Sequence, residues 1–168
     1  KLSSSGIEAS YLVSVFDEFG KIRETHITGE RPLTLYIDKQ EIVTLMTLGK
    51  NPELLVIGYL YNQGFIKKTE DLKSVQVDWD VESAVVETKT KISNLEKRLE
   101  KRTVTSGCGQ GTVFGNMMED LDKIKLNSPT LHQSSFYRLL KNIREYNEVY
   151  KKSGAVHGCA LCLDENIE

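Results

Sequence analysis

The sequence predicts a mixed fold of strands and helices, either α/β or α+β, in which a strand-rich N-terminal portion precedes a helix–strand portion. Apolar residues alternate near residues 11–15, 33–45 and 75–86, which is typical of half-buried strands. A helix-start signal at Asn51 separates the second and third of these segments, and residues 136–149 carry apolar side chains at helical spacing. The predicted order is therefore strands, helix, strands, then helix and strand.

The strand-rich portion contains one isolated strand and two hairpins. Tyr11, Val13 and Val15 predict the first strand, which a polar stretch separates from Pro32. The first hairpin has its turn at Asp38-Lys39-Gln40. The second follows from the alternation of Val75, Val77, Trp79 and Val81 and the apolar run 84–86, with Trp79 in the core.

Two helices have start or stop signals. Asn51 is expected to cap a helix with Pro52 at its first position and Glu53 at the positive end of its dipole, and Gly64 ends it. A longer helix is expected to be capped by Ser134 or Ser135, to run through Val149 and to end at Gly154. Residues 91–102 and 116–125 are also expected to be helical.

The two ends of the chain differ in character. Residues 1–10 are polar and read as a flexible lead-in rather than a signal peptide. Residues 155–163 read as a buried strand, 164–166 as a turn, and a partner strand would begin at Ile167. An unfinished hairpin leaves ladder groups unpaired, so we expect a fragment of a longer protein. The expected division is 11–102, a loop and linker at 103–130, and a further domain that starts at 131.

Composition and charge exclude several functional classes. The net charge of −2 and the pI near 6.0 argue against a nucleic-acid-binding protein. No apolar run reaches the length of a membrane span. Three cysteines are too few for a disulfide framework and suggest reduced thiols in the cytoplasm. The basic residues between 97 and 102 read as a solvated helix face, with a docking site for an anionic partner as the alternative.

The strongest chemical signal is a cysteine enclosed by glycines in TVTSGCGQGTVF, residues 103–114. Cys108 stands between Gly107 and Gly109, and Gly111 follows. Glycines remove packing from a thiol but expose backbone N–H groups, which stabilise the nucleophilic thiolate. Hydroxyl donors precede the cysteine at Thr105 and Ser106. The segment predicts a reactive thiol, against the alternative of a turn that contains a cysteine. A dinucleotide fingerprint is excluded, because its third glycine would stand where Thr112 is.

The C-terminal sequence HGCALC, residues 157–162, allows two interpretations. His157, Cys159 and Cys162 have residue types and spacing that zinc could use. In a strand, however, Cys162 would face away from the other two, so small thiols buried in a core strand are preferred. His157 is open between a core histidine and a site residue. His26 and His132 carry no pattern and read as surface residues.

Taken together, several segments resemble one family. The segments ERPLTLY (30–36), LM (45–46), ELLVIGYL (53–60), GFI (64–66), TVTSGCG (103–109) and SGAVH (153–157) stand in the order found in the formate dehydrogenase accessory sulfurtransferases, the FdhD/NarQ family. The resemblance covers roughly residues 28–168. The G-C-G and S-G-A-V-H stretches are its most specific parts.

The resemblance implies a cytoplasmic homodimer that takes persulfide sulfur from a cysteine desulfurase. The sulfur would pass to the molybdenum (or tungsten) bis-guanine-dinucleotide cofactor of the formate dehydrogenase catalytic subunit. It implies a C-terminal domain that resembles cytidine deaminases without their zinc chemistry. The persulfide cysteine maps onto Cys108, and the family histidine onto His157. Cofactor contacts are expected from Thr105, Ser106, Gly107, Gly109, Gly111 and His157.

Two departures from the family pattern matter. Many members have a second cysteine three residues after the first, where this chain has Gly111, so a persulfide in this loop would rest on Cys108 alone. The family's acidic-V-G-R-H segment, with much of the guanine-nucleotide contact, would lie beyond Glu168. The alternatives are a cofactor-binding chaperone of formate dehydrogenase without catalysis and, less favoured, a small zinc-binding module.

Overall fold

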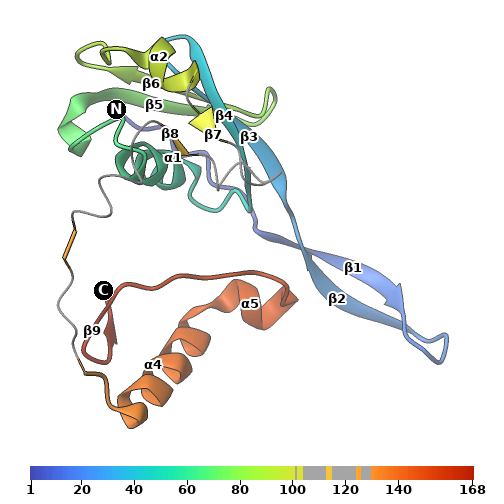
Figure 1. Ribbon diagram of the computed structural model, residues 1–168. Coiled ribbons are helices and arrows are strands. Elements are labelled where there is room, and N and C mark those ends of the chain that lie inside the picture. Colours follow the sequence, from blue (N-terminus) through green and yellow to red (C-terminus); the bar gives the residue numbers. More distant parts are fainter. Residues whose placement is uncertain (101, 104–112, 115–123, 126–129) are drawn as a thin grey trace. The chain divides into compact units, whose positions relative to one another are not determined.

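The computed structural model describes residues 1–100, 102–103, 113–114, 124–125 and 130–168 (Figure 1). The chain divides into two compact units. The sheet unit contains residues 1–7 and 30–125, and the helical unit contains residues 8–29 and 126–168. The sequence analysis assigned residues 11–29 to the N-terminal portion, whereas the structure groups residues 8–29 with residues 126–168.

The sheet unit is built on a four-stranded sheet of order β4-β3-β6-β5. Its strands form two antiparallel hairpins, β3 (Arg31–Ile37) with β4 (Gln40–Thr47) and β5 (Leu72–Asp78) with β6 (Ser83–Thr88). The two hairpins join through the parallel pairing of β3 with β6. Both predicted hairpins are confirmed, and the first turns at Asp38 and Lys39, which have φ of 47° and 78°.

The core of the sheet unit lies between one face of the sheet and helix α1 (Pro52–Asn62). Alternate strand residues such as Leu33, Leu35 and Ile37 are fully buried, as the period-2 pattern predicts. Val56 and Leu60 of α1 meet them. Trp79 packs against this core while remaining half-buried, rather than lying inside it as predicted.

Short elements complete the sheet unit. They are the 3₁₀ turn η1 (Thr69–Asp71), helix α2 (Leu95–Glu100) and the strands β7 (Arg102–Thr103) and β8 (Val113–Phe114). The helix predicted over 91–102 is thus shorter. Residues 91–94 precede α2, and Arg102 belongs to β7. Most of the helix predicted over 116–125 lies outside the described residues, and Ile124 and Lys125 are not helical.

Helix α1 begins and ends at the predicted residues. Gly64 has φ of +68°, and the Phe65 amide donates to the Leu60 carbonyl at 2.8 Å while the Gly64 amide donates to Tyr61 at 3.0 Å. This pattern is a Schellman motif, so the predicted glycine stop is confirmed. At the other end Asn51 occupies the N-cap position, Pro52 begins the helix and Glu53 lies in its first turn, as predicted, but the Asn51 side chain makes no capping hydrogen bond.

The N-terminal segment expected to be a flexible lead-in runs along the edge of β5. Backbone hydrogen bonds join Ser3 N to the Val75 carbonyl at 3.0 Å and Val75 N to the Lys1 carbonyl at 2.9 Å. The Ser3 hydroxyl and the Ser5 amide donate to Oε1 of the buried Glu53, at 2.6 and 2.8 Å. The serines therefore satisfy the edge of the sheet and a buried carboxylate together.

The helical unit contains a hairpin of β1 (Ser10–Phe16) and β2 (Ile22–Thr28), followed by α4 (Gln133–Tyr146) and α5 (Glu148–Ser153). The predicted strand at 11–15 is confirmed. Its partner β2 was not predicted, because the sequence IRETHIT lacks apolar alternation. Helix α5 contacts both strands of this hairpin.

The single long helix expected at 134–153 is two helices. Helix α4 begins after His132, not at Ser134 or Ser135, and it ends before Asn147. The Asn147 side chain accepts a hydrogen bond from the Tyr150 amide at 3.0 Å and so caps α5. A side-chain cap in mid-segment competes with helix continuation. The end at Gly154, with φ of +59°, is confirmed.

The chain ends in a small hairpin of β9 (Cys162–Leu163) and β10 (Asn166–Ile167), with Asp164 and Glu165 in the turn. The predicted turn is confirmed. The buried strand expected over 155–163 is wrong: residues 155–161 are in no strand, and the side chains of Leu161 and Leu163 are 77% and 65% exposed. Within the described residues, no other sheet covers these two leucine side chains.

Replacing Glu53 with glutamine tests the attachment of the N-terminal segment. Burial alone would raise the pKa of Glu53, but the hydrogen bonds from Ser3 and Ser5 hold it below its ordinary value. A lowered folded-state pKa adds stability above the unfolded-state pKa, and that stability is lost as pH falls through the folded-state value. We expect E53Q to lower the free energy of unfolding by about 1–2 kcal/mol at neutral pH, and by less in acid.

The measurement is urea unfolding followed by fluorescence of Trp79, the one tryptophan of the chain. The control is Glu24→Gln, a matched change at an exposed position of β2. Equal losses in E53Q and E24Q at neutral pH would contradict the account of Glu53.

Candidate functional site

Strands β7 and β8 bracket the glycine-rich segment. They pair antiparallel, with Arg102 opposite Phe114 and Thr103 opposite Val113. The pairing closes a connection of nine residues, 104–112, and Cys108 is the middle residue of that connection. Thr105, Ser106, Gly107, Cys108, Gly109 and Gly111 themselves lie outside the described residues. The structure therefore shows the strands that flank the predicted site.

Helix α2 leads directly into β7 and is anchored to the core. Leu95 is buried in the core cluster, and Ile92 and Leu99 pack against it. On the outer side, the Gln40 amide donates to Glu96 Oε1 at 3.2 Å. Helix α2 is thereby held by apolar packing against the sheet.

Arg98 provides the polar anchor of α2. Its guanidinium donates to the carbonyls of Gln63 and Gly64 at 2.8 and 3.1 Å. Its Cζ lies 4.3 Å from the centroid of the Phe65 ring. The reading of this basic stretch as a wholly solvated face is thus wrong for Arg98, although Lys97 is exposed. Burial lowers the pKa of Arg98, and the carbonyls at the end of α1 satisfy its donors.

His157, the predicted site residue that the structure describes, is exposed in the irregular segment after α5. It is therefore not a core histidine. Cys159 is exposed and Cys162 is half-buried at the start of β9, so the burial of both thiols in a core strand is also wrong. The prediction took the apolar character of Ala160 and Leu161 as a sign of burial, but both residues are exposed.

The hairpin that follows these thiols is fastened to α4. Glu165 accepts hydrogen bonds from Arg138 Nε at 2.6 Å and from the Ser135 hydroxyl at 3.0 Å. A second Arg138 nitrogen reaches the other carboxylate oxygen, which makes the pair bidentate. The Asn142 amide donates to the Glu165 carbonyl at 3.0 Å. Ser135, Arg138 and Asn142 share one helix face. We call these three residues together with Glu165 the Glu165 clamp.

The zinc interpretation receives no support from the described part of the chain. No group of three His, Cys, Asp or Glu side chains there is arranged to hold a metal ion. Of the other histidines, His132 is exposed as predicted, whereas His26 is half-buried, with Nδ1 3.3 Å from the Ser10 hydroxyl.

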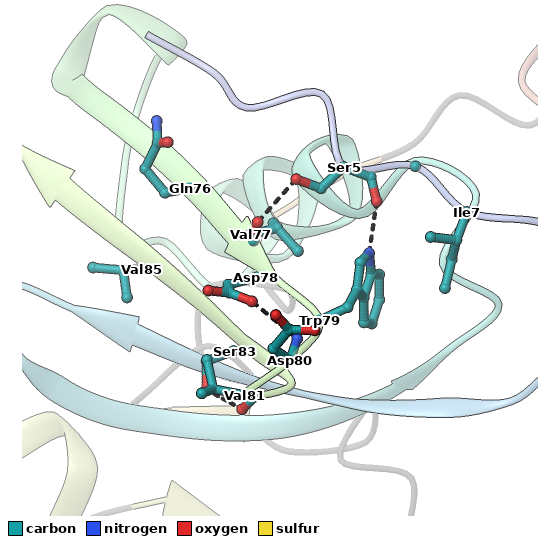
Figure 2. A pocket seen from close by; sticks show the side chains of 11 residues that line it. Ser5, Ile7, Gln76, Val77, Asp78, Trp79, Asp80, Val81, Ser83 and Val85 are labelled. Carbon is teal, nitrogen blue, oxygen red and sulfur yellow. Dashed lines mark hydrogen bonds between the residues drawn. The ribbon is translucent and has the colours of Figure 1, made fainter.

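A hollow of about 670 Å³ lies beside the turn between β5 and β6. Figure 2 shows Trp79 turned toward Ser5, whose carbonyl accepts from the indole nitrogen at 2.6 Å. Asp78, also on its lining, accepts from the Asp80 amide at 2.9 Å. These polar groups are engaged in holding the N-terminal segment and the turn. We therefore interpret the hollow as a result of how the N-terminal segment and the turn pack, and not as a ligand-binding site.

Comparison with known proteins identifies one family over most of the chain. The FdhD/NarQ family matches residues 28–168. A sulfur carrier protein FdhD of Wolinella succinogenes is 29% identical over 145 residues, which are 84% of this chain and 50% of that protein. Its counterpart in Listeria monocytogenes is 30% identical over 147 residues, 86% of this chain and 56% of that protein.

The fold is shared with a solved structure. The crystal structure of a candidate formate dehydrogenase accessory protein from Desulfotalea psychrophila superposes with a TM-score of 0.57 at 17% identity, covering 94% of this chain and 59% of that one. The chain spans about half the length of the curated relatives that it matches.

These matches establish the class. The chain belongs to the FdhD/NarQ family, as the resemblance of its G-C-G and S-G-A-V-H stretches indicated. Within the described residues, no helix combines the length and apolar character that a membrane span requires.

Arg98 and the Glu165 clamp were not found by sequence reasoning. Arg98 stands in a run of charges that looks solvated, and its partners are backbone carbonyls that carry no sequence signal. Ser135, Arg138 and Asn142 have helical spacing, but their shared partner lies 23 to 30 residues away. Only the fold identifies such long-range polar contacts.

Replacing Arg98 with alanine tests the anchor of α2. The variant leaves two carbonyls without their donor and removes a cation–π contact. We expect the free energy of unfolding to fall by about 1–3 kcal/mol and amide exchange to accelerate in residues 95–103. The measurement is hydrogen exchange with mass spectrometry. Lys97→Ala, an exposed neighbour on the same helix, is the control, and equal exchange in R98A and K97A would refute the anchor.

Replacing Arg138 with alanine tests the Glu165 clamp. The hydrogen bonds from Arg138 and Ser135 lower the pKa of Glu165, so the clamp is complete above the ordinary glutamate pKa and weakens as pH falls through the lowered value. We expect faster amide exchange over residues 161–168 in R138A at neutral pH, and a smaller difference from wild type in acid. Lys141→Ala, on the same exposed helix, should leave exchange unchanged. If it matches R138A, the clamp does not hold the hairpin.

Proposed function

We propose that this protein is a sulfur carrier that holds a persulfide on Cys108 and serves formate dehydrogenase. Membership of a family whose curated relatives are named sulfur carrier proteins supports the class of activity. The observation that supports the site is the β7–β8 pairing, which joins the two ends of the glycine-rich segment whose middle residue in sequence is Cys108.

The chemistry is a sulfur transfer between thiols. The Cys108 thiolate attacks the outer sulfur of a persulfide on a cysteine desulfurase, and the donor cysteine leaves as its thiolate. The outer sulfur then rests on Cys108 until the acceptor takes it. Backbone amides at Gly107, Gly109 and Gly111, with the hydroxyls of Thr105 and Ser106, would stabilise the anionic sulfur.

The acceptor in this proposal is the molybdenum or tungsten bis-guanine-dinucleotide cofactor, bound as substrate. His157 is exposed and so accessible to a ligand of this size. As a neutral or protonated imidazole it can donate a hydrogen bond to a phosphate or a base. In this proposal the protein acts in the cytoplasm as a homodimer, and its partners are the desulfurase and the catalytic subunit of the dehydrogenase.

Replacing Cys108 with serine tests this function in cells that lack their own family member. A hydroxyl cannot carry sulfane sulfur, so formate dehydrogenase activity should fall by more than about 100-fold, because removing a nucleophile removes the covalent step. Glu24→Gln, at an exposed position outside the proposed site, keeps the thiol and should retain most activity. Western blotting confirms that the variants accumulate equally.

The alternative to catalysis is a chaperone that binds the cofactor or the immature dehydrogenase. If C108S matures the dehydrogenase as well as the wild type does, the carrier function is wrong and the chaperone remains. The two outcomes separate the hypotheses without any assumption about the structure of residues 104–112.

A further inference from the structure

Two thiols outside the glycine-rich segment are presented at the surface. Cys159-Ala-Leu-Cys162 has the C-x-x-C spacing of dithiol redox motifs. Cys159 is exposed, and Cys162 is half-buried with its Sγ 4.0 Å from the Ala160 carbonyl. Both are free thiols. A structural cysteine is usually buried as a small hydrophobe, and neither of these is.

The segment that carries these thiols has neighbours in the helical unit on both sides. Before Cys159, Gly158 lies against α4–α5: a Cβ at this position would be 3.1 Å from the Asn147 side-chain nitrogen. After Cys162, Glu165 is held by the Glu165 clamp on α4. Figure 1 shows the chain after α5 running back beside α4 to β9. The thiols are therefore held on the helical unit and stay exposed.

The backbone around Cys159 has no regular secondary structure that would hinder a change of conformation. Residues 155–161 are in no helix or strand, whereas Cys162 pairs with Ile167 in the β9–β10 hairpin. Cys159 can thus approach Cys162 without breaking a strand ladder. A disulfide needs its two Cα atoms within about 7 Å, which a turn over two intervening residues provides.

We propose that Cys159 and Cys162 form a dithiol that accepts one sulfane sulfur and releases it as hydrosulfide. The inference rests on the proposed function for its supply of persulfide. A persulfide carries sulfur in the sulfane state, and its release as sulfide needs two electrons. The connection 104–112 contains one cysteine, Cys108, so it holds no second thiol to supply them. The C-x-x-C pair supplies both.

The reaction has two balanced steps. First, the exposed Cys159 thiolate attacks the outer sulfur of a persulfide, which forms a persulfide on Cys159 and releases the donor as a thiolate. Second, the Cys162 thiolate attacks Sγ of Cys159. A Cys159–Cys162 disulfide forms, the sulfur–sulfur bond of the persulfide breaks, and hydrosulfide leaves with the electron pair. Two thiols are oxidised and one sulfane sulfur is reduced.

Glutathione persulfide is the probe that tests the pair, because it needs no desulfurase. Wild type, C108S, C162S and the double variant C159S/C162S are each treated with it. Hydrosulfide is measured as its bimane derivative, and peptides 155–168 are mapped by mass spectrometry. The wild type should form the Cys159–Cys162 disulfide and release about one hydrosulfide per disulfide. C162S should retain one extra sulfur on Cys159.

The two sources of sulfur give different results in C108S. If the pair accepts sulfur directly, C108S forms the disulfide as the wild type does. If sulfur reaches the pair only from Cys108, C108S forms none while the wild type still does. Both outcomes support the dithiol. It is overturned if the wild type forms no Cys159–Cys162 disulfide, if it releases no more hydrosulfide than the double variant does, or if C162S carries no sulfur on Cys159.

This design separates failure of the pair from failure of the proposed function. Absence of sulfur on Cys108 after treatment with a desulfurase would refute the carrier, whatever glutathione persulfide does at Cys159. A wild type that carries sulfur on Cys108 but forms no disulfide would refute the dithiol alone.

Discussion

The contact of Arg98 with the end of α1 is the interaction on which the described surroundings of Cys108 depend. Gly64 turns the chain at the helix end, which directs Phe65 and Ile66 into the core and leaves the carbonyls of residues 63 and 64 facing α2. Arg98 binds both carbonyls and covers the Phe65 ring. One glycine conformation therefore couples the core of the sheet unit to the helix that leads into β7. Strand β7, which precedes the connection that contains Cys108, begins only two residues after that helix ends, at Arg102.

The helical unit is stabilised differently from the sheet unit. Its helix α4 has no buried residue, and the unit is held by polar contacts, of which the Glu165 clamp and the Asn147 cap are the clearest. Polar clamps of this kind fix backbone positions without covering side chains, which leaves His157 and Cys159 open to reagents and partners. A thiol fixed in place but exposed is suited to exchange chemistry, whereas a buried thiol is inert. The exposed placement of residues 155–163 is thus the observation on which the proposed dithiol rests.

The sequence predicted those features that local patterns encode. Alternation at Leu33, Leu35 and Ile37 predicted the buried face of the sheet, and Gly64 predicted the end of α1, because both depend on neighbours in sequence. The β2 strand was missed because its exposed polar residues carry no alternation, and the strand at 155–163 was predicted wrongly because apolar residues there stay exposed. Arg98 and Glu165 could not be predicted, since their partners are distant in sequence. Cys108 was singled out by its glycines alone, and its role stays a prediction.

The most direct test of the carrier function is to follow the sulfur atom itself. The protein is incubated with a cysteine desulfurase and isotope-labelled cysteine, and each cysteine peptide is analysed by mass spectrometry without reduction. The proposal predicts labelled sulfane sulfur on the Cys108 peptide, which disappears when reductant is added and is absent from that peptide in C108S. Labelled sulfur that never resides on Cys108, while the desulfurase turns over normally, would contradict the proposal.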